Sequence, residues 1–209
     1  MKDKDEKKRA ETAETAGSAA RPGAVVTVTP PRATATVTQK AKPAKPRKDT
    51  AADAVRRLAT NDPGGRHICY RAYISQQGWQ EPVCDGTLAG TTGGGQTINA
   101  LNIAAYGVNG SAANAFVHVA KSKDGKGRWS PSWTAIAADG ENNYVGSARG
   151  DAPALLGFAV NVGSGRVCHS ARLRGGGWGP QICADKRPSY LFGGSVDNDA
   201  RLEAIKLTV

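Results

Sequence analysis

The first 66 residues of the chain contain no tryptophan, tyrosine or phenylalanine, and no cysteine or histidine. Their apolar residues are mostly alanine and valine, which bury too little surface to offset the entropy lost on folding. Residues 1–66 are therefore predicted to form a disordered tail. Residues 67–209 hold every aromatic residue and are numerous enough for one domain.

Long apolar runs are also missing. The nearest candidate, Gly23–Val28, is short and is followed by two prolines, so neither a secretory signal nor a membrane span is expected. The Cys-x-x-Cys spacing that is typical of structural zinc sites does not occur. No motif of a catalytic site stands out either. We expect a protein that is not an enzyme and that uses no metal or cofactor.

Positive charge is concentrated in the tail. Residues 1–66 contain 15 lysines and arginines and 8 acids, which gives +7 of the formal net charge of +10. Residues 40–48 carry five of these cations, two prolines and no acid. This basic segment is interpreted either as a contact for an anionic surface or as a semi-rigid soluble spacer. The domain itself carries only +3, so specific nucleic-acid binding is not expected.

A short helix is predicted near residues 50–60. Thr50 and Asp53 have the spacing of a capping box, and Val55 and Leu58 fall on one helical face. The Asp-Pro-Gly-Gly sequence that starts at Asp62 ends the pattern. A helix of about ten residues is marginal alone and would need to dock on something, and we expect it to lead into the domain.

Three similar units follow one another, at about 67–106, 115–162 and 166–209. Each has a tryptophan, an aspartate six or seven residues later, a glycine-bearing turn and a closing strand of alternating apolar residues. The pairs are Trp79 with Asp85, Trp133 with Asp139, and Trp178 with Asp185. The predicted glycine-bearing turns include Gly90 and Gly193-Gly194.

The cysteines follow the same repeat. Cys69 and Cys84 are 15 residues apart, as are Cys168 and Cys183, and each pair flanks its tryptophan at matching distances. A hairpin would bring each pair side by side, so two disulfides, Cys69–Cys84 and Cys168–Cys183, are predicted. The alternatives are a four-cysteine metal site and a cysteine–histidine nucleophile. The latter would use Cys69 near His67 or Cys168 beside His169. It is disfavoured because no third orienting group is evident, and because Cys168 and His169, as neighbours on a strand, point to opposite faces.

These features resemble the clostridial hydrophobic repeat with conserved tryptophan. The resemblance is carried by Gly78-Trp79, by the segment from Ala89 to Gly93, and by the closing sequence Arg-Leu-Glu-Ala-Ile-Lys-Leu at 201–207. The first and third units match well, and the second matches only at Trp133, Asp139-Gly140 and its closing strand. The resemblance implies a bacterial protein, secreted or on the cell surface, that binds polymers or other surface molecules.

The fold is predicted to be all-β with pseudo-threefold symmetry. A single unit could not bury its apolar face, whereas three units closed together leave few exposed sheet edges. A β-prism of three sheets is expected, and a β-trefoil is the alternative. The same order of tryptophan, glycine turn and closing strand is loosely similar to that of vitelline membrane outer layer proteins, which are β-prisms.

Two interpretations of the repeated residues remain open. We favour the one in which Trp79, Trp133 and Trp178 fill the core and the aspartates shape turns. In the other, the tryptophans stack on sugars and the aspartates accept hydrogen bonds from hydroxyl groups. Trp129 has no counterpart and follows a loop rich in glycine and lysine, so it is the best candidate for an exposed contact. The candidate ligand-binding residues are Trp129, Asp85, Asp139 and Asp185.

The expected function is non-catalytic binding of a carbohydrate or cell-envelope polymer. The alternative is a structural or protein-interaction domain that is tethered by its tail. Paired cysteines favour a secreted or cell-surface location, although no export signal is visible, and a cytoplasmic location with reduced cysteines is the alternative.

Overall fold

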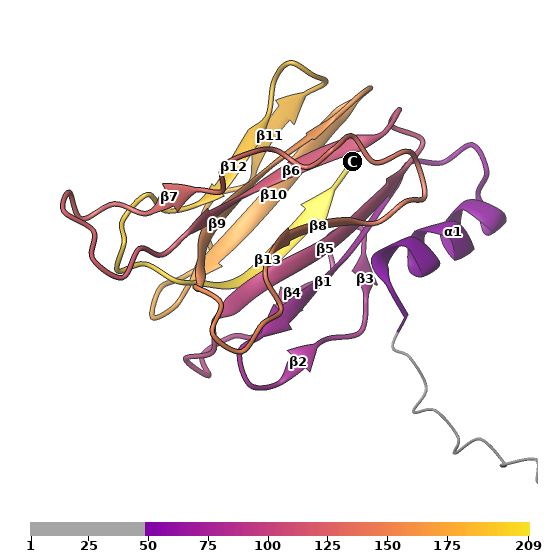
Figure 1. Ribbon diagram of the computed structural model, residues 1–209. Coiled ribbons are helices and arrows are strands. Elements are labelled where there is room, and N and C mark those ends of the chain that lie inside the picture. The colour runs from indigo at the N-terminus through magenta and orange to yellow at the C-terminus, as the bar shows by residue number, and fades with distance from the viewer. Residues whose placement is uncertain (1–48) are drawn as a thin grey trace, which may run out of the picture. The chain divides into compact units, whose positions relative to one another are not determined.

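The computed structural model describes residues 49–209 (Figure 1). The predicted disorder up to residue 48 and the basic segment 40–48 lie outside these residues. The regular structure of the described chain is mostly β, with one helix, as the sequence predicts. No helix in this part of the chain is long and apolar enough to cross a membrane.

The helix α1, Ala51–Asn61, begins and ends close to the predicted positions. The Thr50 hydroxyl accepts the N–H of Asp53, and the Asp53 carboxylate accepts the N–H of Thr50, which confirms the capping box. Ala51 and Val55 are fully buried and pack against Cys69 of the β domain. The folded region thus begins before residue 67, with a helix that docks on the sheet beside it.

Within residues 49–209, thirteen strands form three antiparallel sheets, here called A, B and C. Sheet A contains β1 (His67–Ile74), β2 (Gly78–Trp79), β3 (Val83–Cys84), β5 (Ile98–Tyr106) and β8 (Asn143–Gly146). Sheet B contains β4 (Ala89–Gly90), β10 (Arg166–Leu173), β11 (Ile182–Asp185) and β13 (Leu202–Thr208). Sheet C contains β6 (Ser111–Val117), β7 (Arg128–Trp129), β9 (Leu155–Val162) and β12 (Leu191–Gly194).

All three sheets share one plan. In each, a long first strand (β1, β6 or β10) pairs with a short hairpin strand on one side and a long closing strand (β5, β9 or β13) on the other. The strand beyond the closing strand comes from another unit. The first unit supplies β4 to sheet B, the second supplies β8 to sheet A, and the third supplies β12 to sheet C. The units therefore exchange strands in a cycle.

One glycine in each exchanged strand makes this pairing possible. Gly90, Gly146 and Gly194 have φ of 109°, 75° and 131° and lie against the backbone of a closing strand. A Cβ on any of them would come within 2.2 to 2.3 Å of a closing-strand carbonyl oxygen. The prediction that the glycines at 90 and 193–194 form turns is therefore wrong. They lie in short strands whose partners are distant in sequence, which local patterns do not reveal.

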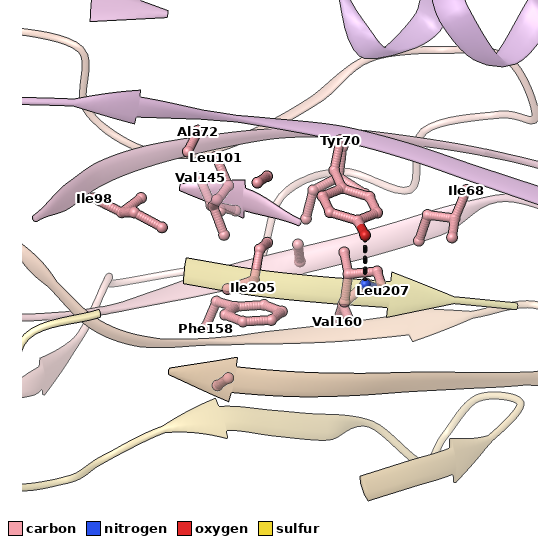
Figure 2. Close-up of a cluster of buried hydrophobic side chains, with 14 of the residues drawn as sticks. Ile68, Tyr70, Ala72, Ile98, Leu101, Val145, Phe158, Val160, Ile205 and Leu207 are labelled. Atoms are coloured by element: carbon pink, nitrogen blue, oxygen red, sulfur yellow. Dashed lines mark hydrogen bonds between the residues drawn. The ribbon is translucent and has the colours of Figure 1, made fainter. Parts of the chain in front are cut away.

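The core lies between the inward faces of the three sheets. Leu101, Phe158 and Ile205, one from each closing strand, are fully buried at its centre (Figure 2). The ring of Tyr70 on β1 is also fully buried, and its hydroxyl accepts the N–H of Leu207 on β13 at 2.9 Å, as the dashed line in Figure 2 shows. The same hydroxyl donates to the carbonyl of Thr87. Tyr70 thus connects the first and last strands of the domain.

Candidate functional site

Strand register identifies which tryptophans are equivalent. The register between the first and closing strands shifts at Tyr73/Ile74, Phe116/Val117 and Arg172/Leu173. The residue just before each shift is the one that lies opposite a tryptophan. These pairs are Tyr73 with Trp79, Phe116 with Trp129, and Arg172 with Trp178. Trp129 is therefore the tryptophan of the second unit, and the prediction that Trp133 has this role is wrong.

The three equivalent tryptophans lie on the outward faces of their sheets and do not fill the core. Trp178 is 36% exposed and Trp129 is 37% exposed, while Trp79 is half-buried. Trp133, which was also expected in the core, is 37% exposed. The predicted core role is thus wrong, because aliphatic and phenylalanine side chains of the closing strands already fill the space between the sheets.

Trp79 on sheet A is enclosed by its neighbours. Its ring makes edge-to-face contacts with Tyr73 at 5.5 Å and Tyr144 at 5.8 Å between centroids. The guanidinium carbon of Arg71 lies over the ring, 4.7 Å from its centroid. Arg71 also donates to the carbonyl of Asp49, just before α1. This tryptophan is therefore part of the packing around the docked helix.

Trp129 on sheet C belongs to a three-ring cluster that remains partly open. Its ring lies 5.0 Å from Phe116 and 5.4 Å from Phe192, between centroids. Phe192 comes from the exchanged strand β12. Gly157 leaves room for these rings, because a Cβ there would lie 2.8 Å from the Phe192 ring. The missing side chain at 157 thus lets aromatic residues of two units meet on the outward face.

Trp178 borders a cavity of about 320 Å³ where sheets B and C meet. The walls include Ile182 on β11 and Phe192 on β12, and Ile182 is 47% exposed. The ammonium nitrogen of Lys206 lies over the indole, 4.7 Å from the ring centroid. Because Phe192 also contacts Trp129, the cavity and the three-ring cluster are continuous. We call Trp129, Phe192, Trp178 and Ile182 the aromatic face (β7, β11 and β12 in Figure 1).

His169 lies at the base of this cavity and is 3% exposed. Its Nε2 is 3.0 Å from the carbonyl oxygen of Phe192, an acceptor, so Nε2 carries the proton. Nδ1 has no hydrogen-bond partner among the described residues. Burial lowers the pKa of this histidine below its ordinary value, and the bond to Phe192 opposes that effect. The base of the cavity is therefore uncharged near neutral pH.

The three predicted aspartates are occupied by turns and strand ends. The carboxylate of Asp139 accepts four backbone N–H groups, those of residues 107–110, at 2.8 to 3.2 Å. Asp85 accepts the N–H of Ile68 at 2.9 Å and contacts Nδ1 of His67 at 2.9 Å. Asp185 pairs with Arg166 at 2.9 Å. None of them lines the cavity beside Trp178, so of the predicted ligand-binding residues only Trp129 belongs to the aromatic face.

All four cysteines are paired as predicted, Cys69 with Cys84 and Cys168 with Cys183. The four-cysteine metal site and the cysteine–histidine nucleophile are therefore both wrong, because no free thiol remains. Within residues 49–209, no group of three or more potential metal ligands lies together.

The geometry describes an all-β module with three equivalent tryptophans, two of them open to solvent. The family model described as Clostridial hydrophobic W matches residues 73–105, which confirms the resemblance over the stretch from Trp79 to β5. No curated protein and no solved structure gives a significant match.

Sequence reasoning missed Phe192, Ile182 and Lys206 as neighbours of the exposed tryptophans. The sequence could have indicated Lys206 and Ile182, because they lie on strands of the same unit as Trp178. The sequence could not have indicated Phe192, because this residue reaches the aromatic face only through the exchange of β12 into sheet C.

Proposed function

We propose that the domain is a non-catalytic module that binds carbohydrate of a cell-envelope polymer through the aromatic face. The observation that carries this proposal is the pair of exposed tryptophans, Trp129 and Trp178, at the two ends of a surface joined by Phe192. Tryptophan rings provide flat apolar area for the C–H faces of sugars, and the cavity beside Trp178 offers a concave contact.

The surroundings of Trp178 support the choice of sugar over a purely apolar ligand. Lys206 covers one face of the indole and brings a donor of hydrogen bonds to the edge of the surface. The aspartates that might have acted as catalytic carboxylates are committed to turns and to ion pairs, which supports binding without hydrolysis.

The test compares tryptophan variants of the full chain on insoluble cell-wall polysaccharide and on a glycan array. Trp178→Ala and Trp129→Ala should each weaken retention about tenfold, since a lost stacking contact is worth roughly 1 to 2 kcal/mol. Trp133→Ala is the matched control, because Trp133 is equally exposed but packs on Tyr190 and belongs neither to the three-ring cluster nor to the cavity wall. The proposal fails if no polysaccharide is retained, or if all three variants lose retention equally.

A protein-interaction role is the second candidate, and a different group of exposed side chains favours it. Trp133 and Tyr190 lie 5.4 Å apart between ring centroids, and Tyr190 is 53% exposed. Ile136, three residues after Trp133, is 61% exposed. Exposed aromatic and aliphatic groups of this kind are typical of protein contacts. A stoichiometric protein partner that is lost in Trp133→Ala and retained in Trp178→Ala would support this candidate.

We also infer that the three-sheet arrangement is a β-prism. Separate hydrogen-bonded sheets, one built mainly from each unit, support the prism, whereas a trefoil would use hairpins in a shared barrel. A secreted or cell-surface location is proposed as well, because two disulfides favour an oxidising compartment. Four free thiols in protein taken from its native compartment would contradict that location.

A further inference from the structure

The connection between β6 and β7 is longer than its counterparts in the other two units. Residues 118–127 span ten positions, whereas residues 75–77 join β1 to β2 and residues 174–177 lead from β10 to Trp178. Surface connections that exceed what the fold requires often carry binding residues. This loop therefore distinguishes the second unit from the others.

The loop encloses a hollow of about 290 Å³ that is lined by cationic side chains. The cations are Lys121, Lys123, Lys126 and Arg128. All four are exposed, and none forms an ion pair within the described part of the chain. With Asp124 as the only acid in the lining, the hollow carries a net charge of +3.

Asp124 forms no ion pair with these cations in the described part of the chain. Its carboxylate accepts the backbone N–H of Lys126 at 3.0 Å, which is the main reason that the pKa of Asp124 is lowered, and the charge of Lys126 is only a minor cause. The Ser122 hydroxyl donates to the carbonyl of Lys126 at 2.7 Å. Both contacts close the turn at the tip of the loop, so the lysine side chains remain free to meet an anion.

Asn198 of the third unit holds the loop in place. Its side chain accepts the N–H of Val119 at 2.8 Å and donates to the carbonyl of Val119 at 2.9 Å, and its own N–H donates to Gly125 at 2.8 Å. Asn198 is 8% exposed, so these bonds are shielded from water. The cations are thus presented by a loop that is fixed at both arms, which lowers the entropy cost of binding.

We propose that this hollow binds the phosphate groups of an anionic cell-envelope polymer. Three ammonium groups and a guanidinium fork suit an anion with several oxygens. Arg128 and Trp129 are consecutive residues of β7, so the hollow lies at the same edge of sheet C as the aromatic face, although the two side chains point to opposite faces of the strand. A membrane surface fits less well, because Val119 is the only large apolar side chain that lines the hollow.

The inference extends the proposed function and rests on it for the nature of the polymer.

Full-length protein is titrated with poly(glycerol phosphate), with neutral dextran and with vesicles that contain phosphatidylglycerol. Lys121→Gln/Lys123→Gln/Lys126→Gln should weaken binding to poly(glycerol phosphate) about tenfold or more, and wild-type affinity should fall as salt is raised. The matched control is Arg149→Gln/Arg174→Gln/Lys186→Gln, which removes the same charge outside the loop and retains the same tail.

Asn198→Ala is the second variant, since it leaves every cation in place. It should also weaken binding to the polymer by roughly threefold or more, because the loop is no longer held at both arms. Equal losses in the loop and control triple variants would overturn the proposal, as would binding to vesicles without binding to polymer, or no binding by wild type. If neutral glycans are not retained but the loop-dependent binding persists, the proposed sugar-binding function fails and the anion site stands.

Discussion

The hydroxyl of Tyr70 and the backbone N–H of Leu207 are joined by a hydrogen bond of 2.9 Å in the centre of the core. The two residues are 137 positions apart in the sequence, and both are fully buried. Burial raises the pKa of Tyr70 to about 12, so its hydroxyl remains protonated and also donates to Thr87. One phenol thus satisfies polar groups of two unconnected segments.

Tyr70→Phe should lower the free energy of unfolding by about 2 kcal/mol, because the buried N–H of Leu207 and the carbonyl of Thr87 both lose their partner. Chemical denaturation followed by fluorescence measures the change. Tyr73→Phe is the control, since Tyr73 lies on the outward face beside Trp79 and its change should stay within about 0.5 kcal/mol. Equal effects of the two substitutions would contradict the role of the Tyr70 hydroxyl.

Gly146→Ala should lower the free energy of unfolding by about 3 kcal/mol, because φ is positive and the new Cβ would lie 2.2 Å from the carbonyl oxygen of Asn99. Thermal and urea unfolding both report this loss. Gly150→Ala offers the comparison, since no heavy atom lies within 4 Å of a Cβ there. A Gly146→Ala protein as stable as Gly150→Ala would show that β8 does not pair with β5 as described.

The two disulfides should be reduced at different rates. Cys69 is fully buried beneath α1, whereas Cys183 is exposed on β11. Thiol–disulfide exchange needs access to a sulfur atom, so a mild dithiol should open Cys168–Cys183 first. Timed alkylation and peptide mass spectrometry follow each pair. The rates should become similar in denaturant, and faster reduction of Cys69–Cys84 in the folded protein would contradict the docking of α1.

Stability should fall as the pH drops below 6.5, in part because of His169. Burial lowers its pKa in the folded state below the ordinary value of 6.5, so the unfolded chain takes up a proton first as the pH falls. The contribution of His169 is therefore fully present above pH 6.5 and is lost progressively below it. In His169→Gln, the free energy of unfolding should vary less between about pH 7.5 and 5.5. An unchanged pH profile in urea titrations would contradict a neutral, buried His169.

The parts of the fold that depend on local spacing could be predicted from the sequence. The capping box at Thr50 and the two disulfides follow from residues only 3 and 15 positions apart, and a hairpin or a helical turn fixes such distances. The alternating apolar residues of the closing strands likewise indicated the buried face, as Phe158 and Ile205 illustrate.

The parts of the fold that depend on pairing between distant segments could not be predicted from the sequence. The exchanged strands have two to four residues and contain glycine, so they look like turns until their partners are known. Asp139 follows Trp133 at the distance seen in the first unit, so spacing alone predicts that Trp133 is the tryptophan of the second unit. The true equivalent of Trp79 and Trp178 is Trp129, which follows the ten-residue loop before Arg128 and does not have that distance to Asp139. The strand register along β6, and not the distance along the chain, decides which tryptophan corresponds to Trp79 and Trp178.

The cyclic exchange of β4, β8 and β12 sets the number of repeats. In an open array, such as a solenoid, a unit can be gained or lost at an end while its neighbours keep their contacts. Here every unit supplies one strand to another unit's sheet and receives one in its own sheet. Deleting a unit therefore removes the edge strand from the sheet of one remaining unit, and it leaves the other remaining unit with a strand that has no partner. Copy number in this domain is therefore fixed by the cycle of strand exchange, whereas the loops between strands can differ in length without breaking it, as residues 118–127 of the second unit do.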